Sequence, residues 1–369
     1  MNAELRQLTD SARQVVAGLG LAADEQEAAS LIAELGWLMV STPEEQGGLG
    51  MGVTGACALH TELGRGLARV PFLPQWLAID AASSSAWPGR ESWLECMMAG
   101  ERRVTASLGE SSLSVGQDGG GMILNGSAVA LASADLASHV LITAEDRACV
   151  ALLALDQPGV RIVPQPTWDV TRRLFDLEVK DVALDQELII ARGPSVLVIR
   201  ERLAILRDLA LAADAVGGAT ALLDRTVEYL QTRQQFGRPL ALFQALKHRC
   251  ADLKARSDAA QALLQDSLEA VTDSGGDVMA APDATMKALA AKQLACSTYA
   301  AVAEESLQLH GGIGMTSEHE CHLFLKRALL NEHLGRGHDS YDQGLAGLFI
   351  GNLNQGTTTN DSLSSVEAG

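Results

Sequence analysis

Two stretches of this sequence decide its fold: Arg233-Gln234-Gln235-Phe236-Gly237-Arg238-Pro239-Leu240 and Gln308-Leu309-His310-Gly311-Gly312-Ile313-Gly314. The first lies in a strongly helical region that begins after Gly193-Pro194. It leads into residues spaced three and four apart, which form one face of a long helix in a bundle: Phe243, Leu246, Cys250, Leu253, Ser257, Ala260 and Leu264. In the second stretch, Gly311-Gly312 suits the C-terminal end of another helix.

Outside these stretches, the pattern of apolar and polar residues changes twice along the chain. Residues 1–100 have helical periodicity, whereas residues 101–192 contain short apolar runs separated by turn residues, which predict a β domain. Within that domain, Asn125-Gly126 predicts a hairpin turn. The helical bundle occupies 193–352, and the tail at 353–369, rich in Asn, Thr, Ser and Gly, is expected to be disordered.

The composition limits the classes of partner. The net charge is −18 and no block of basic residues stands out, so we expect neither nucleic acid nor a membrane surface as a partner. The N-terminus lacks the features of a signal peptide, and no apolar stretch is long enough to span a bilayer. Six cysteines without a CxxC pair predict reduced, mostly buried thiols in a cytoplasmic protein.

One cluster, His319-Glu320-Cys321-His322, invites a metal interpretation. Its spacing matches no known ligand pattern, and a helix would point these side chains around several faces. We therefore predict no metal site.

The two deciding stretches resemble the two C-terminal signatures of the acyl-CoA dehydrogenases. Lys326-Arg327 after the second stretch, Pro43-Glu44-Glu45-Gln46-Gly47-Gly48, and Glu62-Leu63-Gly64-Arg65 also match that family, and the resemblance covers roughly residues 1–350. It implies an α+β multidomain fold, with an N-terminal helical domain, a barrel-like middle β domain and a C-terminal four-helix bundle.

The resemblance also implies FAD as the cofactor, held across a subunit interface. One subunit's middle domain holds the flavin ring, and a neighbour's bundle holds the ADP portion. By position, Arg233 would face the pyrophosphate, with Gln235 and Phe236 beside it. The ADP portion would contact further residues: Gln244, Gln308, Gly311 and Gly312. Without the signatures, Arg233 would be a surface charge and the two glycines a helix cap.

The family's reaction requires a carboxylate that removes the α-proton of an acyl-CoA thioester while hydride leaves the β-carbon. The two positions at which the resemblance places this base hold Arg336 and Arg207, and an arginine stays protonated. Asp208 points about 100° away from Arg207 on a helix. Asp214, two turns along the same face, is the best remaining candidate for the base, although it could instead be a buried acid paired within the bundle.

The residues expected to face the flavin ring are also altered. Ala106-Ser107-Leu108-Gly109-Glu110-Ser111-Ser112 stands where the family has a Thr-Glu-Pro motif running into Gly-Ser. Ala130-Leu131-Ala132-Ser133 stands where the family has Trp-Ile-Thr-Asn, so an aromatic stacking partner and a hydroxyl donor are missing.

An intact ADP side beside an altered flavin side predicts a heteromeric enzyme. The chain resembles subunits of actinobacterial heterotetrameric (α2β2) dehydrogenases that act on CoA thioesters of steroid side chains. This resemblance implies a homologous subunit, an acyl-CoA substrate and an electron-transfer flavoprotein or similar acceptor as partners. Two alternatives stay open: a self-sufficient homotetramer with Asp214 as the base, and a non-enzymatic binding or assembly module.

Overall fold

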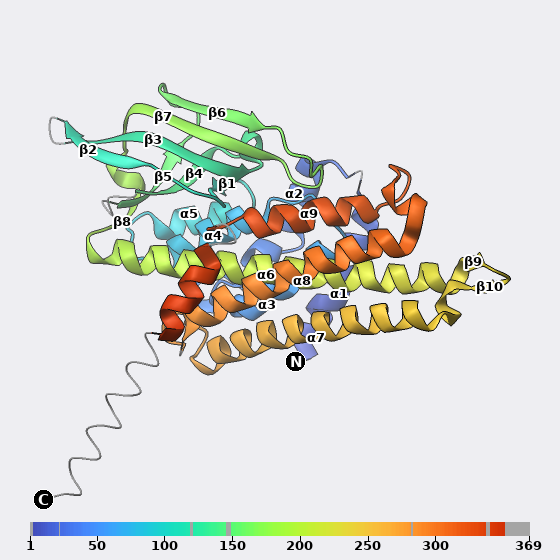
Figure 1. Ribbon diagram of the computed structural model, residues 1–369. Coiled ribbons are helices and arrows are strands. Elements are labelled where there is room, and N and C mark those ends of the chain that lie inside the picture. Colours follow the sequence, from blue (N-terminus) through green and yellow to red (C-terminus); the bar gives the residue numbers. More distant parts are fainter. Residues whose placement is uncertain are drawn as a thin grey trace, which may run out of the picture.

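The computed structural model describes residues 3–21, 23–118, 121–144, 149–281, 283–336 and 340–350; the predicted disordered tail lies outside these ranges. The N-terminal helices form one layer of the molecule (Figure 1). Their bounds are α1 Ala3–Leu19, α2 Glu25–Glu34, α3 Gly52–Arg65, α4 Phe72–Ser83 and α5 Arg90–Met98. Helix α4 is buried along almost its whole length, because it lies between the other helices and the β domain.

Two four-stranded sheets form the middle of the chain. One has the order β1-β4-β5-β8 and the other β2-β3-β7-β6, and isolated bridges such as Ser107 to Leu131 connect the two. The strands are β1 Val104–Ala106, β2 Ser114–Asp118, β3 Gly121–Ala132, β4 His139–Thr143, β5 Cys149–Ala154, β6 Val160–Gln165, β7 Leu174–Ala183 and β8 Ile189–Arg192. The sheets enclose an apolar core of their own, which includes Leu124, Val140 and Leu177.

The hairpin predicted at Asn125-Gly126 is wrong. These residues lie inside β3, where the register with β7 shifts between Leu124 and Gly126. Gly126 has a φ of 118°, and a Cβ there would lie closer than 3.0 Å to the backbone of Ser112. The side chain of Asn125 accepts a hydrogen bond from the backbone N–H of Asp181 at 2.8 Å. The dipeptide therefore serves a β-bulge, which also favours glycine.

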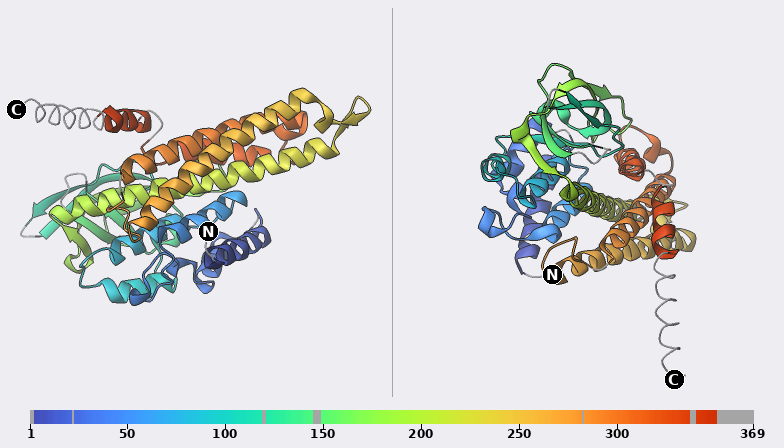
Figure 2. Two further views of the ribbon diagram at one scale, coloured as in Figure 1. Left: turned by 90° about the horizontal axis from the view of Figure 1, so that it is seen from below. Right: turned by 90° about the vertical axis from the view of Figure 1, so that its left-hand side faces the viewer.

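Four long helices follow the sheets and form the bundle (Figure 2). They are α6 Pro194–Thr232, α7 Gln244–Asp273, α8 Ala284–His310 and α9 Cys321–His333. The predicted face of α7 holds in part: Leu253, Ser257, Ala260 and Leu264 are buried. The predicted order of helical, β and helical regions is confirmed. No helix among the described residues is long and apolar enough to cross a membrane.

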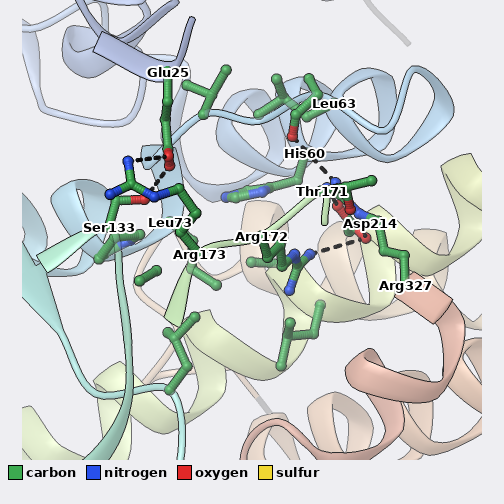
Figure 3. A pocket seen from close by; sticks show the side chains of 17 residues that line it. Glu25, His60, Leu63, Leu73, Ser133, Thr171, Arg172, Arg173, Asp214 and Arg327 are labelled. Carbon is green, nitrogen blue, oxygen red and sulfur yellow. Dashed lines mark hydrogen bonds and ion pairs between the residues drawn. The ribbon is translucent and has the colours of Figure 1, made fainter. Parts of the chain in front are cut away.

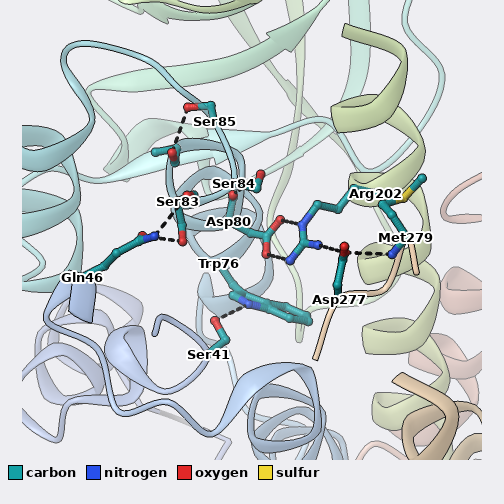
Figure 4. A network of polar contacts seen from close by, with 11 residues as sticks. Ser41, Gln46, Trp76, Asp80, Ser83, Ser84, Ser85, Arg202, Asp277 and Met279 are labelled. Atoms are coloured by element: carbon teal, nitrogen blue, oxygen red, sulfur yellow. Dashed lines mark hydrogen bonds and ion pairs between the residues drawn. The ribbon is translucent and has the colours of Figure 1, made fainter. Parts of the chain in front are cut away.

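Helix α6, 39 residues long, contacts both the N-terminal helices and the β domain as well as the rest of the bundle. Near its start, Arg202 forms a bidentate ion pair with Asp80 on α4, at 2.6 and 2.8 Å, and a third contact to Asp277 at 3.0 Å (Figure 4). Because a planar guanidinium matches a carboxylate in two places, this contact fixes the angle between α6 and the N-terminal helices.

Close backbone approach between α3 and α6 depends on two glycines. A Cβ at Gly64 would lie closer than 3.0 Å to the backbone of Asp214, and a Cβ at Gly217 equally close to the backbone of Thr61. Only residues without a side chain permit this crossing, because backbone atoms on the facing helix cannot rotate away.

We expect Gly217→Ala to lower the free energy of unfolding by roughly 1–3 kcal/mol, because the added methyl group overpacks the crossing. Gly18→Ala is the matched control, since a Cβ at Gly18 meets no atom within 4 Å and the position is helical. The control should gain up to about 1 kcal/mol. Urea unfolding followed by circular dichroism measures both, and equal stability of the two variants would contradict the close crossing.

Candidate functional site

The first deciding stretch forms a tight hairpin at the far end of α6 (Figure 1). There β9 (Gln234–Gln235) pairs antiparallel with β10 (Arg238–Pro239). Between them, Phe236 and Gly237 have φ angles of 55° and 75°, as a type I′ hairpin turn requires. Glycine adopts this conformation freely, whereas phenylalanine does so under strain. The turn projects the ring of Phe236 outward, and this side chain is 89% exposed.

The second deciding stretch lies at the same end of the bundle. The hydroxyl of Tyr229, near the end of α6, donates to the carbonyl of His310 at 3.2 Å, and the two rings stack at 4.4 Å. After His310, Gly311 leaves the helix with a φ of 64°. A Cβ at Gly311 or Gly312 would meet no atom within 4 Å, so the backbone here is open to another molecule.

The structure brings all seven predicted cofactor residues to this end, and all seven are exposed: Arg233, Gln235, Phe236, Gln244, Gln308, Gly311 and Gly312. The guanidinium of Arg233 forms no ion pair with the described residues. A cationic donor close to an open stretch of glycine backbone fits an anionic diphosphate. Their role in binding FAD stays a prediction.

A cavity of about 600 Å³ lies near the other end of α6, between the sheets, α6 and α8. Both positions expected for the base, Arg207 and Arg336, line it. A Cβ at Gly335 would lie 3.4 Å from Nε of Arg207, so the two positions converge in space. The sequence correctly indicated that neither offers a carboxylate.

A local network holds the guanidinium of Arg207 in place. Its Nε donates to Oδ1 of Asp208 at 2.9 Å, and the hydroxyl of Tyr341 donates to the same oxygen at 2.7 Å. Asp208 also lines the cavity, but its carboxylate is buried and engaged by these two donors. The acid beside the expected base position is therefore a counter-ion for the arginine.

The two flavin-facing segments lie side by side, since Ser107 bridges to Leu131 and the N–H of Leu108 donates to the carbonyl of Ala130 at 3.1 Å, but they mainly line different cavities. Ala106, Ser107, Gly109 and Ser111 line the large cavity, whereas Ala132 and Ser133 line a separate cavity of about 40 Å³. The hydroxyl of Ser107 donates to the carbonyl of Val129 at 2.7 Å and is thus not free for a cofactor. Among the described residues, no aromatic side chain lines the large cavity. These residues do not offer the flavin contacts that the family pattern requires.

The two ends of α6 are too far apart to serve one cofactor within one chain. At 1.5 Å per residue, Arg207 and Arg233 are separated by roughly 40 Å along the helix. This separation is much longer than a dinucleotide. A dinucleotide bound at the hairpin end therefore does not reach the cavity end of the same chain.

The small cavity contains Asp214 (Figure 3). Its carboxylate pairs with Arg327, whose Nε donates to Oδ1 at 3.1 Å, and with Arg172 at 3.1 Å. The side-chain amide of Asn331 donates a further hydrogen bond to Oδ1 at 2.7 Å. Burial tends to raise the pKa of Asp214, but the two guanidinium groups outweigh it and lower the pKa well below the ordinary value of 3.8. A carboxylate held in this way is a weak base.

Comparison with known proteins identifies the family. Residues 2–101 match the N-terminal domain of acyl-CoA dehydrogenases, and residues 196–341 match the C-terminal domain. The acyl-CoA dehydrogenase IpdE2 of Mycolicibacterium smegmatis is 33% identical over 298 residues, which cover 81% of this chain and 79% of that protein. The chain belongs to the acyl-CoA dehydrogenase family. Its members are FAD-dependent oxidoreductases that act on the CH–CH group of acyl-CoA thioesters.

Two solved structures have the same fold. One is a variant of the Tcur3481–Tcur3483 steroid ACAD, with a TM-score of 0.84 and 27% identity over 95% of this chain and 99% of that chain. The other is the ChsE4–ChsE5 complex from Mycobacterium tuberculosis, with a TM-score of 0.83 and 24% identity over 95% of this chain and 98% of that chain.

Within this acyl-CoA dehydrogenase fold, sequence reasoning missed the partners of Asp214. Arg172 lies between β6 and β7, and Asn331 lies on α9, so neither is near Asp214 in the sequence. Arg327 matched the family pattern in the sequence, but that match does not indicate that it pairs with Asp214. No local pattern signals such a cluster, because its members come from three separate elements.

The structure also brings together His310, His319 and Cys321, whose ligand-capable atoms lie within 4.8 Å of one another. His319 precedes α9 and His310 ends α8, so the single-helix argument did not apply to them. Nδ1 of His310 donates to the carbonyl of Ser306 at 2.8 Å, and burial raises the pKa of Cys321 to about 12. The thiol is therefore neutral here, and the prediction of no metal stays a prediction.

We expect Asp214→Asn to destabilise the fold by roughly 3–5 kcal/mol, because two buried guanidinium groups lose their counter-ion. The matched control is Asp224→Asn on the same helix, where an exposed ion pair with Arg65 contributes roughly 0–1 kcal/mol. Urea unfolding measures both variants. A fully stable Asp214→Asn protein that has lost only turnover would instead support Asp214 as the base.

The stability difference between wild type and Asp214→Asn should also depend on pH. The folded pKa of Asp214 is lowered, so the unfolded chain takes up its proton first as the pH falls through 3.8. The stability difference between wild type and Asp214→Asn should be constant above about pH 5 and shrink below it. A difference that grows on acidification would contradict the buried ion pair.

Proposed function

We propose that this chain is the non-catalytic subunit of a heteromeric FAD-dependent acyl-CoA dehydrogenase, and that it completes the FAD site of a second, homologous chain. The observation that carries the proposal is the contrast between the two ends of α6. The cavity end holds Arg207 and Arg336 where a carboxylate base is required, whereas the hairpin end exposes polar residues, among them Arg233, which has no ion pair within the described residues. A chain with these two ends supplies binding groups to a partner that performs the chemistry.

The hairpin end would hold the ADP portion of the partner's cofactor. Arg233 would donate charge-assisted hydrogen bonds to the pyrophosphate, with Gln235 and Phe236 beside it. Four further residues would contact the ADP portion from α7 and the end of α8: Gln244, Gln308, Gly311 and Gly312. FAD, when bound, accepts the hydride that leaves the β-carbon of the acyl chain.

The substrate class and remaining partners follow from similarity. The likeness to a structure described as a steroid ACAD supports an acyl-CoA ester of a steroid side chain as the substrate. The likeness to the ChsE4–ChsE5 complex supports a homologous partner subunit, in a heterotetramer. We further propose an electron-transfer flavoprotein or similar protein as the electron acceptor, and the cytoplasm as the location.

The alternative of a self-sufficient homotetramer requires Asp214 as the base. Its carboxylate is 2% exposed and engaged by Arg327, Arg172 and Asn331, which leaves no position for a substrate proton. Geometry decides whether a group can act as a base before its pKa matters. The ion-paired carboxylate therefore favours the heteromeric proposal. A pure assembly module would have this fold without any effect on flavin binding.

Co-expression with a homologous subunit encoded nearby should yield a yellow complex that oxidises an acyl-CoA ester, whereas this chain alone should be colourless. In the complex, we expect Arg233→Gln to weaken FAD binding about tenfold to a hundredfold, because a hydrogen bond to a charged group contributes roughly 1.5–3 kcal/mol. FAD titration of the flavin-free complex, followed by flavin fluorescence, measures the dissociation constant.

Arg256→Gln is the matched control, because Arg256 is exposed on α7 and lies two helical turns or more from the hairpin. It should leave FAD binding unchanged. A full complement of flavin and turnover by this chain alone would refute the proposal. A complex whose FAD affinity ignores Arg233→Gln would support the assembly module.

A further inference from the structure

The large cavity remains after its base and its flavin contacts are lost. We propose that it binds a ligand with a bulky apolar body and a single carboxylate group. This inference goes beyond the proposed function, since it concerns binding by this chain itself. It requires only that the chain's own cavity be free of flavin.

The walls of the cavity combine apolar side chains with polar and charged groups, so the cavity suits a ligand that has both. Branched side chains line it from the sheets and from the helices, among them Leu113, Val140, Ile142, Leu177, Leu203 and Leu289. Its volume of about 600 Å³ lies within the range of roughly 300–1,000 Å³ that is usual for small-molecule sites. A rigid ring system loses little conformational entropy on entering such a space.

The charged groups of the lining lie mainly on one wall, and their net charge is positive. Arg200 and Arg207 lie seven residues apart on α6, which places them on one face about 10 Å apart. Arg336 adds a third guanidinium, while Glu201 and Asp208 supply two carboxylates. The lining therefore has one positive charge in excess, and a monoanion would neutralise it.

Two of the three guanidinium groups are available to a ligand. Arg207 is engaged by Asp208 and Tyr341, whereas Arg200 and Arg336 form no ion pair within the described part of the chain. The carboxylate of Glu201 accepts a hydrogen bond from Thr285 at 2.9 Å. A planar guanidinium binds a carboxylate in two places, so Arg200 and Arg336 suit this group well.

An unsatisfied hydroxyl supports the same conclusion. Ser111 lines the cavity, and its Oγ is buried without a hydrogen-bond partner in the described structure. Leaving such a group without a partner costs roughly 1–3 kcal/mol, so native proteins rarely do so. A polar atom of a bound ligand would satisfy Ser111.

The backbone beside Arg336 fixes its place on the cavity wall. The N–H of Gly335 donates to the carbonyl of Leu108 at 2.6 Å, which ties this turn to the sheet. Gly335 has a φ of 94°, and a Cβ there would collide with the hydroxyl of Tyr341. Arg336 is thus held at the rim between the sheets and α6, where a carboxylate can reach it from the cavity.

Isothermal titration of the full-length chain with cholate tests the proposal, because cholate has a fused-ring apolar body and one carboxylate. The primary amide of cholate is the uncharged control ligand. We expect cholate to bind about tenfold more tightly than the amide. Arg336→Gln and Arg200→Gln should each weaken cholate binding about tenfold and leave amide binding nearly unchanged.

Arg256→Gln is again the matched control, since it removes the same charge from a surface outside the cavity. Thermal unfolding followed by circular dichroism verifies that every variant is folded. In the complex, the same substitutions should abolish one cholate site for each copy of this chain and leave the partner's sites unchanged. That measurement keeps the test decisive if the isolated chain does not fold.

Three results would overturn the proposal: no cholate binding, equal affinity for cholate and its amide, or affinity unaffected by both arginine substitutions. Flavin bound in this chain's own cavity would also overturn it. The proposed function fails on a different observation, which is turnover by this chain alone. Each failure can therefore be recognised without the other.

Discussion

The buried carboxylate of Asp214 is the interaction on which the arrangement of the three parts depends. It lies on α6 and pairs with Arg327 of α9 and with Arg172 of the β6–β7 connection. Arg327 also donates to the carbonyl of Ala68 at 3.2 Å and to the hydroxyl of Thr171 at 3.3 Å. Because a buried charge is tolerated only with its partners in place, helices, sheets and the N-terminal layer must meet in one geometry.

The two ends of α6, on either side of Asp214, have different properties. At the cavity end, Arg202 is clamped to Asp80, and Arg207 is held by Asp208 and Tyr341. At the hairpin end, the bundle projects beyond the rest of the molecule, with exposed Phe236 and Met315. Exposed apolar residues beside unpaired polar groups are typical of a surface completed by another chain. The helix between these ends keeps them roughly 40 Å apart, which is consistent with the proposed sharing of a cofactor between subunits.

The sequence predicted the order of the helical and β regions because periodicity is local. The family resemblance placed Arg207 and Arg336 at the two positions expected for the base, and these positions converge at the cavity. Prediction from the sequence failed where contacts between residues far apart in the chain determine the local structure. Asn125-Gly126 has the chemistry of a turn, but pairing with β7 holds it inside a strand. The ion pairs of Asp214 join residues 42 or 113 positions apart, and no periodicity reports such contacts.

Arginine at the base positions does more than remove a function. A neutral residue in place of the carboxylate would abolish proton abstraction and remove one negative charge, whereas arginine also adds a positive charge that must be accommodated. Asp208 and Tyr341 accommodate Arg207. The ammonium of Lys292 lies 4.0 Å from the centre of the Tyr341 ring. Burial lowers the pKa of Lys292. The polar wall is thus organised around cations rather than around a base. Burying a charge costs free energy unless it is paired, which is the physical basis of the anion binding proposed for this cavity.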